Sequence, residues 1–519
     1  MPRLAAPRLA RGRLVPRRLA LPGAVLLALV VTFVIAWVTL PGPAKVVVPG
    51  SQTVAVTSVT RSCPPATPGA ATSPVTMIAV PAAAGGAAAG ASSGTATFSA
   101  VSAAPAGSAK PTSAAPGAKE TTGAKETSGP REGRPVTVSA PGTVATVAAA
   151  SGGSAVAATG QMAEGFEAEQ ADASGTGLVS CTHPGSDMWF VGSGQSAGAA
   201  RIWLYLMNTG RVTASADITI LTDTGEQSGL SSAITVLPGQ SVKENIAPLV
   251  TGSQALALHV QANTGQVAAS VWEGSSSGSG AWLPQAAAPS TTQVIPGLTV
   301  ASSSAKLFVV VPGTTDAQLR VVAYTPAGAV NQFPGNPVDA SAGAATPLAL
   351  NSLGASASGL KLTANVPVVA GVLVPGSGIG SFTTGASPVA EQGVVAGNPA
   401  SRGVTVGLLL TAPAAAAQAS VSVISADGTV TKPATDQAVT VAAGHTLALT
   451  VPRPAGSTRQ AFAIVLTPVA GSGPLYAVRV VTSGAGGLSA PTVSLLPVQS
   501  APTSISLPPA RDSYQAVLP

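Results

Sequence analysis

Three stretches of the chain, each about 100 residues long, carry the same succession of apolar and alternating segments. Equivalent segments begin near Leu204, Leu307 and Val406. Apolar and polar residues alternate in 217–220 and in 420–423, which is typical of half-buried β-strands. A fixed period indicates tandem copies of one structural unit. The repeat therefore restricts the chain to an all-β fold made of successive similar domains.

The turn residues indicate the type of domain. Gly225, Gly328 and Gly428 end corresponding strands and are preceded by Thr, Ala and Asp, consistent with tight hairpin turns. Roughly six or seven short strands per unit predict antiparallel, Ig-like β-sandwiches. A propeller blade has four strands in about 40–50 residues, so these units are too long to be blades. The predicted β-sandwich repeats are residues 181–292, 293–397 and 398–519, the last including the C-terminal tail.

Residues 44–180 are expected to form a divergent relative of these repeats. The stretch of about 82–134 consists mostly of Ala, Gly, Ser, Thr and Pro, and is predicted to be a disordered insertion because it can bury little apolar surface. An acidic cluster follows, made of Glu164, Glu167, Glu169 and Asp172. The spacing of a known calcium loop is missing, so this cluster is interpreted as a solvated connector, with calcium binding as the alternative.

The N-terminus carries a topological signal. Residues 19–40 form an uncharged apolar run, and about 20 apolar residues are needed to cross a bilayer. The preceding residues include six arginines: Arg3, Arg8, Arg11, Arg13, Arg17 and Arg18. Basic flanks stay cytoplasmic, which predicts a cytoplasmic tail at 1–18, a transmembrane signal anchor at 19–40, and the bulk of the chain outside the cell. Cleavage of the run as a secretory signal is the alternative.

The charge balance points away from nucleic acid. The chain has 25 Lys and Arg against 19 Asp and Glu, and its pI near 9.6 results from the six tail arginines. The remaining chain is formally neutral and has no clustered basic patch in its sequence, which nucleic-acid recognition requires. Nucleic acid is therefore not an expected partner.

The chain has two cysteines, Cys63 and Cys181, both on the outer side of the predicted anchor. An even number of cysteines in an oxidising compartment favours a disulfide, with two free buried thiols as the alternative. Closure of a loop this long stabilises by roughly 4–5 kcal/mol in the chain-entropy model. The bridge would tie residues 44–180 to the first repeat.

The motifs for chemistry are weak. Residues 194–198 have the Gly-x-Ser-x-Gly pattern around Ser196, but a nucleophile elbow needs a helix after the turn, and an apolar strand is expected there. His183, His259 and His445 have no ligand partners at metal spacing. We therefore predict no catalytic, cofactor-binding or metal-binding residue.

Aromatic residues gather in the first repeat, although only 3% of the chain is aromatic. The set consists of Trp189, Phe190, Trp203, Tyr205, Trp272 and Trp282. One interpretation is a core of large residues around a central strand. The other is an exposed platform that stacks on sugar rings or docks a partner, because exposed aromatic patches mark interaction sites.

Several short motifs accompany the anchor and the cysteines: Ser-Cys-Pro-Pro at 62–65, CTHPGSDMWFVGSG at 181–194 and LMNTG at 206–210. With these motifs the chain resembles a family of uncharacterised actinobacterial envelope proteins, in which the Asn-Thr-Gly at 208–210 is Asn-Pro-Gly. The resemblance implies an envelope-polysaccharide context beside membrane glycosyltransferases. It supplies no catalytic residue.

These observations predict a single-pass membrane protein that presents tandem β-sandwiches outside the cell. We expect a non-catalytic binding or scaffolding role in envelope polysaccharide assembly, with an envelope glycan or a membrane glycosyltransferase as partner and no cofactor. One alternative is a secreted hydrolase or glycan-modifying enzyme that uses Ser196 or scattered acidic residues. The other is a passive structural stalk, in which the aromatic residues of the first repeat would all be buried.

Overall fold

The computed structural model describes most of the chain, in two compact units that are treated separately: residues 1–52 with 506–519, and residues 53–505. The described residues are 27–35, 52–70, 72–81, 93–104, 135–172, 177–195, 198–228, 233–276, 278–299, 305–335, 337–351, 353, 357–376, 379–432, 438–455, 460–484 and 492–507.

In the smaller unit, residues 27–35 are helical and their side chains are exposed. They lie within the predicted anchor at 19–40, whose other residues fall outside the described part, as do the six tail arginines. Among the described residues, no helix has the length and apolar character that a membrane crossing requires.

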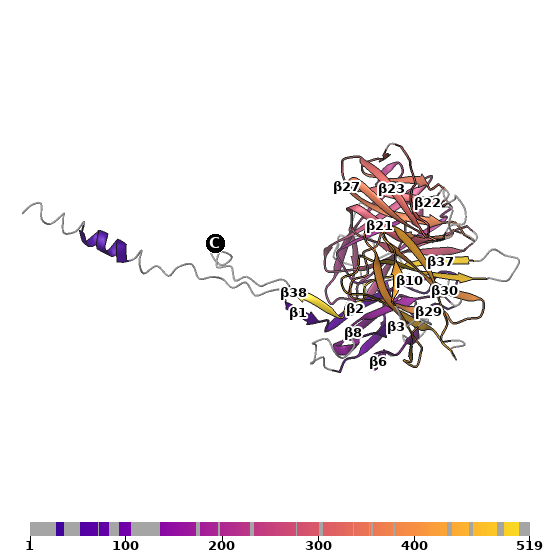
Figure 1. Ribbon diagram of the computed structural model, residues 1–519, viewed down its shortest axis with the longest axis horizontal. Helices are drawn as coiled ribbons and strands as arrows, with labels where there is room; N and C mark the ends of the chain where they lie inside the picture. The colour runs from indigo at the N-terminus through magenta and orange to yellow at the C-terminus, as the bar shows by residue number, and fades with distance from the viewer. Residues whose placement is uncertain are drawn as a thin grey trace, which may run out of the picture. The chain divides into compact units, whose positions relative to one another are not determined.

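The larger unit is all-β and has multiple sheets (Figure 1). Its strand pairs are nearly all antiparallel, as between β11 (Asp187–Ser193) and β17 (Ala255–Thr264), β22 (Lys306–Val311) and β27 (Ser358–Val374), and β30 (Val404–Ala412) and β36 (Tyr476–Ser483). Its chain ends lie side by side, because the Val56 N–H donates a hydrogen bond to the Thr503 carbonyl at 3.0 Å. The terminal strands are β1 (Gln52–Ala55) and β38 (Ser504–Leu507).

The first part of this unit, here called the amino-terminal β-region, covers residues 58–180. Its two sheets have the strand orders β10-β9-β3-β7 and β2-β8-β4-β6. Its elements are β2 (Ser58–Cys63), β3 (Pro74–Ala79), β4 (Ala96–Ala100), β5 (Ser102–Ala103), β6 (Val136–Val138), β7 (Ala145–Ala148), β8 (Ser154–Thr159), η1 (Gly160–Met162), β9 (Phe166–Gln170) and β10 (Val179–Ser180).

The predicted disordered insertion at 82–134 is wrong in one part. Residues 93–104 contain β4 and β5, and Ala96 and Phe98 of β4 pack into the core of the amino-terminal β-region. Their spacing of two residues places both side chains on one face of a strand, which offsets the cost of ordering the segment. The rest of the predicted insertion lies outside the described residues.

Repeat 1, at residues 187–286, also has two sheets, with the orders β14-β13-β17-β11-β20 and β19-β18-β12-β16-β5. The second sheet ends in β5 from the amino-terminal β-region, which pairs in parallel with β16. The elements are β11 (Asp187–Ser193), β12 (Arg201–Met207), β13 (Ala214–Thr222), β14 (Gly225–Gln227), β15 (Ile234–Val236), β16 (Gln240–Asn245), η3 (Ala247–Val250), β17 (Ala255–Thr264), β18 (Ala268–Gly274), β19 (Gly280–Leu283) and β20 (Gln285–Ala286).

Repeat 2, at residues 290–384, has the same succession of strand pairs as repeat 1. The long strand β27 takes the places of both β17 and β18, because its first half pairs with β23 and its second half with β22. The strands are β21 (Ser290–Leu298), β22 (Lys306–Val311), β23 (Ala317–Thr325), β24 (Gly328–Asn331), β25 (Val338–Ala340), β26 (Ala344–Ala349), β27 (Ser358–Val374) and β28 (Ser381–Thr384).

Repeat 3, at residues 393–497, shows the pairing a third time, in sheets of order β29-β35-β31-β32 and β34-β30-β36-β37. Its strands are β29 (Gly393–Asn398), β30 (Val404–Ala412), β31 (Ala417–Ile424), β32 (Val430–Thr431), β33 (Val439–Val441), β34 (His445–Val451), β35 (Phe462–Pro468), β36 (Tyr476–Ser483) and β37 (Thr492–Pro497).

The local sequence accounts for these strands and turns. In β31 buried Ala417, Ala419 and Val421 alternate with exposed residues, the burial pattern of a strand with one covered face. Gly225 and Gly328 have φ of +103° and +121°, in the left-handed region that glycine adopts without strain. Both turns therefore have the conformation for which the sequence placed glycine.

The hydrophobic cores extend across the boundaries between β-regions, and the last region contacts the first. Phe308 and Leu373 of repeat 2 belong to the core of repeat 1, and Leu409 and Val478 of repeat 3 belong to that of repeat 2. A separate cluster joins Ile78 of the amino-terminal β-region to repeat 3, and β29 contacts β3 and β9 (Figure 1). The last repeat thus packs against the first β-region, a contact that a simple linear string of domains would not make.

Candidate functional site

Three of the predicted platform residues form a row across one sheet of repeat 1. Trp203, Trp272 and Trp282 are direct cross-strand neighbours on β12, β18 and β19. Trp272 and Trp282 are 1% and 4% exposed. The ring of Trp272 lies against Gly274 and Gly280, where an added Cβ would come within about 2.2 Å of ring carbons. The two glycines therefore make the space for this ring.

The amino-terminal β-region covers this row. The indole N–H of Trp282 donates a hydrogen bond to Thr67 Oγ1 at 3.0 Å, and Val179 packs in the same cluster as Tyr205, Trp272 and Trp282. The prediction of an exposed platform is wrong for these residues, because the face that they form is buried inside the same chain. Their large apolar area stabilises the contact between two β-regions.

Trp203 is the one member of the set that is half-buried. The ammonium nitrogen of Lys243 lies 3.7 Å from the centroid of its indole ring and 5.5 Å from that of Tyr205. These are cation–π distances. Partial burial lowers the pKa of Lys243, because the ammonium group loses part of its hydration.

Trp189 and Phe190 point to opposite faces of β11. Phe190 is 1% exposed and lies in the core of repeat 1. Trp189 is also buried and stacks on His259 with ring centroids 4.0 Å apart, and His259 Nε2 lies 3.1 Å from Asp187 Oδ1. The exposed platform is therefore wrong for this pair as well, and β-strand pairing supplies His259 with a carboxylate neighbour that its sequence context did not suggest.

The predicted disulfide is confirmed. Cys63 and Cys181 form a disulfide, and both residues are fully buried. The bridge joins the end of β2 to the segment that leads into repeat 1.

The predicted solvated connector is wrong for Glu167 and Glu169, which lie in a buried strand, β9. Glu164 and Asp172 lie on either side of this strand; Glu164 is buried and Asp172 is half-buried. Glu167 forms an ion pair of 2.7 Å with Arg61, and Glu169 forms one of 2.8 Å with Arg479 of repeat 3. All four side chains are at most 5% exposed. The prediction failed because it counted charges, whereas the alternation in Phe166–Gln170 is the period of a strand with one charged face.

Burial shifts the protonation of two carboxyl groups. It raises the pKa of Glu167 to about 7, with Arg61 acting in the opposite direction and Glu169 in the same direction. Burial also raises the pKa of Glu273 on β18 to about 8. The Ser193 hydroxyl and amide donate hydrogen bonds to this carboxyl group at 2.7 and 3.3 Å, and both bonds lower the pKa without cancelling the effect of burial. Glu273 is thus mostly protonated at neutral pH and lies inside repeat 1 as a neutral group.

A groove opens where the end of repeat 1 meets the segments at 183, 385–387 and 497–500, which precede a repeat or lie at or after the end of one; we call it the junction groove. It has a volume of about 300 Å³, in the lower range of ligand pockets. Its walls consist of His183, Gln285, Ala286, Ala287, Gly385, Ala386, Ser387, Pro497, Val498, Gln499 and Ser500. The lining residues are uncharged apart from any protonated fraction of His183.

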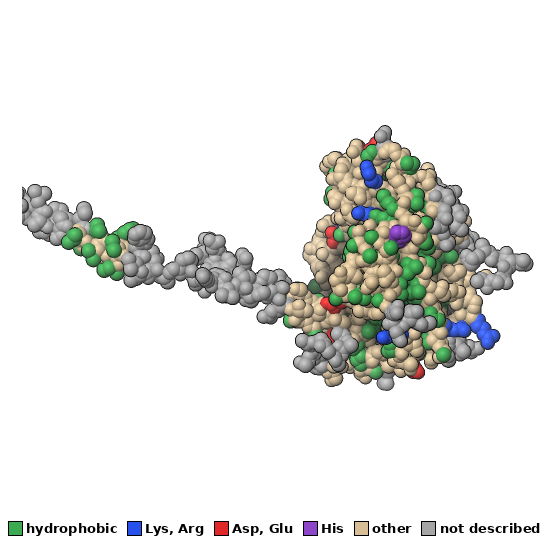
Figure 2. All heavy atoms as spheres, in the orientation of Figure 1, with side chains coloured by type: hydrophobic (Ala, Val, Ile, Leu, Met, Phe, Trp, Pro, Cys, Tyr) green, Lys and Arg blue, Asp and Glu red, His purple; other side chains and the backbone are tan. Residues whose placement is uncertain are grey.

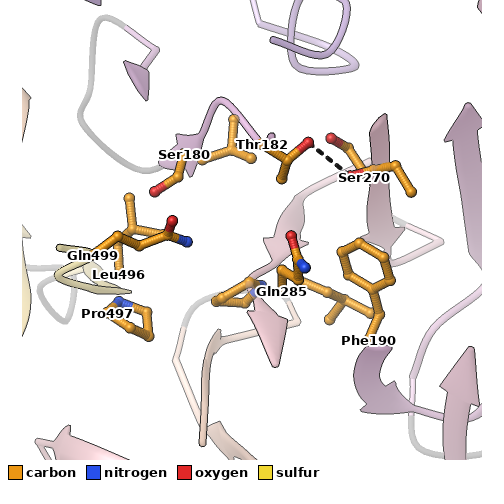
Figure 3. A pocket seen from close by; sticks show the side chains of 12 residues that line it. Ser180, Thr182, Phe190, Ser270, Gln285, Leu496, Pro497 and Gln499 are labelled. Carbon is orange, nitrogen blue, oxygen red and sulfur yellow. Dashed lines mark hydrogen bonds between the residues drawn. The ribbon is translucent and has the colours of Figure 1, made fainter. Parts of the chain in front are cut away.

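A small cavity of about 20 Å³ adjoins the groove and shares Gln285, Pro497 and Gln499 with it. Figure 3 shows Gln285 and Gln499 extending toward this space from opposite sides, with Ser270, Thr182 and Phe190 around it. The Thr182 hydroxyl donates to the Ala269 carbonyl at 3.3 Å. The Ser270 hydroxyl is buried and has no hydrogen-bond partner among the described residues.

His183 contributes a neutral ring to the groove. The side chain of His183 is partly exposed to solvent. Its pKa is nevertheless lowered to about 4, mainly because the surrounding protein atoms disfavour the charged form and secondly because Arg61 is positively charged. The neutral ring has one donor and one acceptor nitrogen, and a hydrogen bond with the Thr60 backbone already engages one of them. The face drawn in Figure 2 likewise carries few charged side chains.

The remaining predicted positions have no site geometry. Ser196 lies outside the described residues. A nucleophile elbow is followed by a helix, whereas the next described element after this motif is the strand β12. Within the described ranges, no group of three or more His, Cys, Asp and Glu side chains could hold a metal ion. Sequence reasoning missed Ser270, Gln285 and Gln499, for which no local pattern provides a signal.

Comparison with known proteins places this chain beside one family. Residues 136–452 match a family of unknown function, DUF5719, and this match covers more than half of the chain. No curated protein and no solved structure matches the chain.

Proposed function

The chain belongs to the DUF5719 family, and we propose that it is a membrane-anchored, extracytoplasmic protein with a non-catalytic binding or scaffolding role in envelope polysaccharide assembly. In this proposal residues 1–18 are cytoplasmic, residues 19–40 span the membrane, and each repeat is an Ig-like sandwich. The disulfide supports the location, because such bridges persist in oxidising compartments.

The junction groove is the observation that carries the binding role. It combines hydrogen-bonding side chains from chain segments more than 300 residues apart, so the tertiary packing of the chain creates it. The strongest buried charges serve a different purpose, since Arg61, Glu167, Glu169 and Arg479 pair with one another. The Glu169–Arg479 pair joins the amino-terminal β-region to repeat 3, whereas Arg61 and Glu167 pair within the amino-terminal β-region. None of these four residues lines the groove.

Site-specific photo-crosslinking in living cells tests this role. A photoreactive residue replaces Gln499 at the groove, and the matched control replaces Gln318, an exposed glutamine on β23 of repeat 2. We expect mass spectrometry to identify a membrane glycosyltransferase or a defined envelope glycan with the first variant and not with the second. Equal capture by both variants, or capture of neither kind of partner, would argue against the proposal.

The enzymatic alternative needs its own measurement. Ser196→Ala should leave the growth and envelope composition of the cells unchanged if the role is non-catalytic. Loss of an envelope component in this variant, with normal protein levels, would favour a hydrolase or a glycan-modifying enzyme.

A further inference from the structure

We infer that the junction groove, together with the small cavity that adjoins it, binds a segment of an uncharged glycan. The hydrogen-bonding groups are the amides of Gln285 and Gln499 and, in the small cavity, the hydroxyl of Ser270. This inference rests on the proposed binding function and names the ligand class. It follows from the polarity of the walls, from the lack of charge and from one unsatisfied buried group.

The walls alternate between apolar surface and neutral hydrogen-bonding groups. Ala286, Pro497 and Val498 provide apolar surface, while Gln285 and Gln499 each provide an amide with both donors and an acceptor. A sugar ring has the complementary character, with apolar C–H faces and an edge of hydroxyl groups. A mixed wall of this kind suits a sugar better than an apolar ligand, which would leave the amides unpaired.

The lining also selects against charge. The groove has no Asp, Glu, Lys or Arg in its walls, and His183 is neutral at physiological pH. An anionic ligand would lose its hydration without gaining a cationic partner, which is costly. The ligand is therefore expected to be neutral.

The small cavity at the end of the groove gives a second, independent indication. Ser270 is 2% exposed, its hydroxyl has no partner among the described residues, and the cavity beside it measures about 20 Å³. This is room for a single water molecule or one hydroxyl group. An unsatisfied buried hydroxyl costs free energy, so a ligand hydroxyl that reaches Ser270 gains more than a contact at an open surface.

Binding of defined oligosaccharides to the purified full-length protein tests the inference. The neutral probes are maltotriose, mannotriose and galactotriose, and the anionic probe is trigalacturonic acid, each titrated to about 5 mM so that dissociation constants in the millimolar range are detected. We expect one neutral probe to bind and trigalacturonic acid to fail. Gln285→Ala and Gln499→Ala should each weaken binding by about three- to tenfold, whereas Gln318→Ala leaves it unchanged.

Ser270→Ala separates a ligand contact from a structural role. It removes an unsatisfied hydroxyl, so the ligand-free protein should be as stable as the original or more stable, while glycan affinity falls. A loss of stability with unchanged affinity would identify the small cavity as a structural water site and overturn this part of the inference.

Different results would refute the glycan assignment and the proposed scaffolding function. Absence of neutral-probe binding, or equal binding of trigalacturonic acid, would overturn the glycan inference. Specific capture of a glycosyltransferase at Gln499 in cells would still uphold the scaffolding role.

Discussion

Replacing Arg479 with alanine should loosen the contact between repeat 3 and the amino-terminal β-region. Arg479 Nη1 lies 2.8 Å from Glu169 Oε2 and also donates to the Gly397 carbonyl at 3.1 Å. Glu169 in turn accepts a hydrogen bond from the Gly397 amide at 3.0 Å. Removal of the arginine leaves a carboxylate buried without its cation, which typically costs about 3–5 kcal/mol.

This cost corresponds to an increase of about a hundredfold to a few thousandfold in the opening equilibrium of the contact. Hydrogen exchange of the β9 and β29 amides measures it directly, because local opening governs their exchange. Arg320→Ala, at an exposed position on β23, is the matched control and should change little. The double variant Glu169→Gln with Arg479→Met should recover most of the loss, since a neutral replacement removes the unpaired charge.

Two results would refute this reasoning. If Arg479→Ala changes exchange in β9 and β29 no more than Arg320→Ala does, the ion pair does not hold the two β-regions together. If the double variant is as destabilised as the single one, the loss comes from packing of the arginine side chain and not from the unpaired carboxylate.

Three further predictions concern stability. Replacing both Cys63 and Cys181 with alanine should cost about 2–5 kcal/mol of unfolding free energy; denaturant unfolding checks this, and a reductant should affect only the unmodified protein. The pKa of Glu273 is raised to about 8, so the folded state holds a proton that the unfolded chain releases, and this group's contribution to stability should fall by about 1.4 kcal/mol per unit as pH rises from 4.5 toward 8. Glu273→Gln should flatten that dependence in unfolding measured at several pH values, and an unchanged slope would contradict the assignment. Trp282→Ala should lower the free energy of unfolding by about 3–5 kcal/mol, and Trp203→Ala should lower it less, because Trp203 is only half-buried. Equal losses in thermal unfolding would show that burial of Trp282 by the amino-terminal β-region is not the source of the stabilisation.

Local pattern was a good guide to the strands and a poor one to the surfaces. The alternation in β13 and β31 and the glycines at 225 and 328 predicted strands and turns that the structure has. The same method misjudged residues 166–170, because a charged strand face is interpreted as solvent-exposed unless its partners are known. Those partners, Arg61 and Arg479, lie about 106 and 310 residues away along the chain.

The candidate site shows the same limit. Gln285 begins β20 in repeat 1 and Gln499 follows the end of β37, and no spacing rule links residues so far apart. The aromatic residues were noticed for their number, yet their role depends on whether another β-region covers them. Trp282 would have the same sequence context in an exposed platform as it has beneath Thr67.

The sequence by itself determined the β-structure of this protein, the repetition of its pattern and its turn glycines, since each depends on residue type and short-range spacing. It also determined the disulfide, because the chain has two cysteines and therefore one possible pairing within it. Only the tertiary structure decided which strand faces are covered, which carboxylates are paired and where a groove remains. The physical reason is that burial and ion pairing are properties of contacts between distant segments, and a strand with two apolar faces does not encode what will cover the second one.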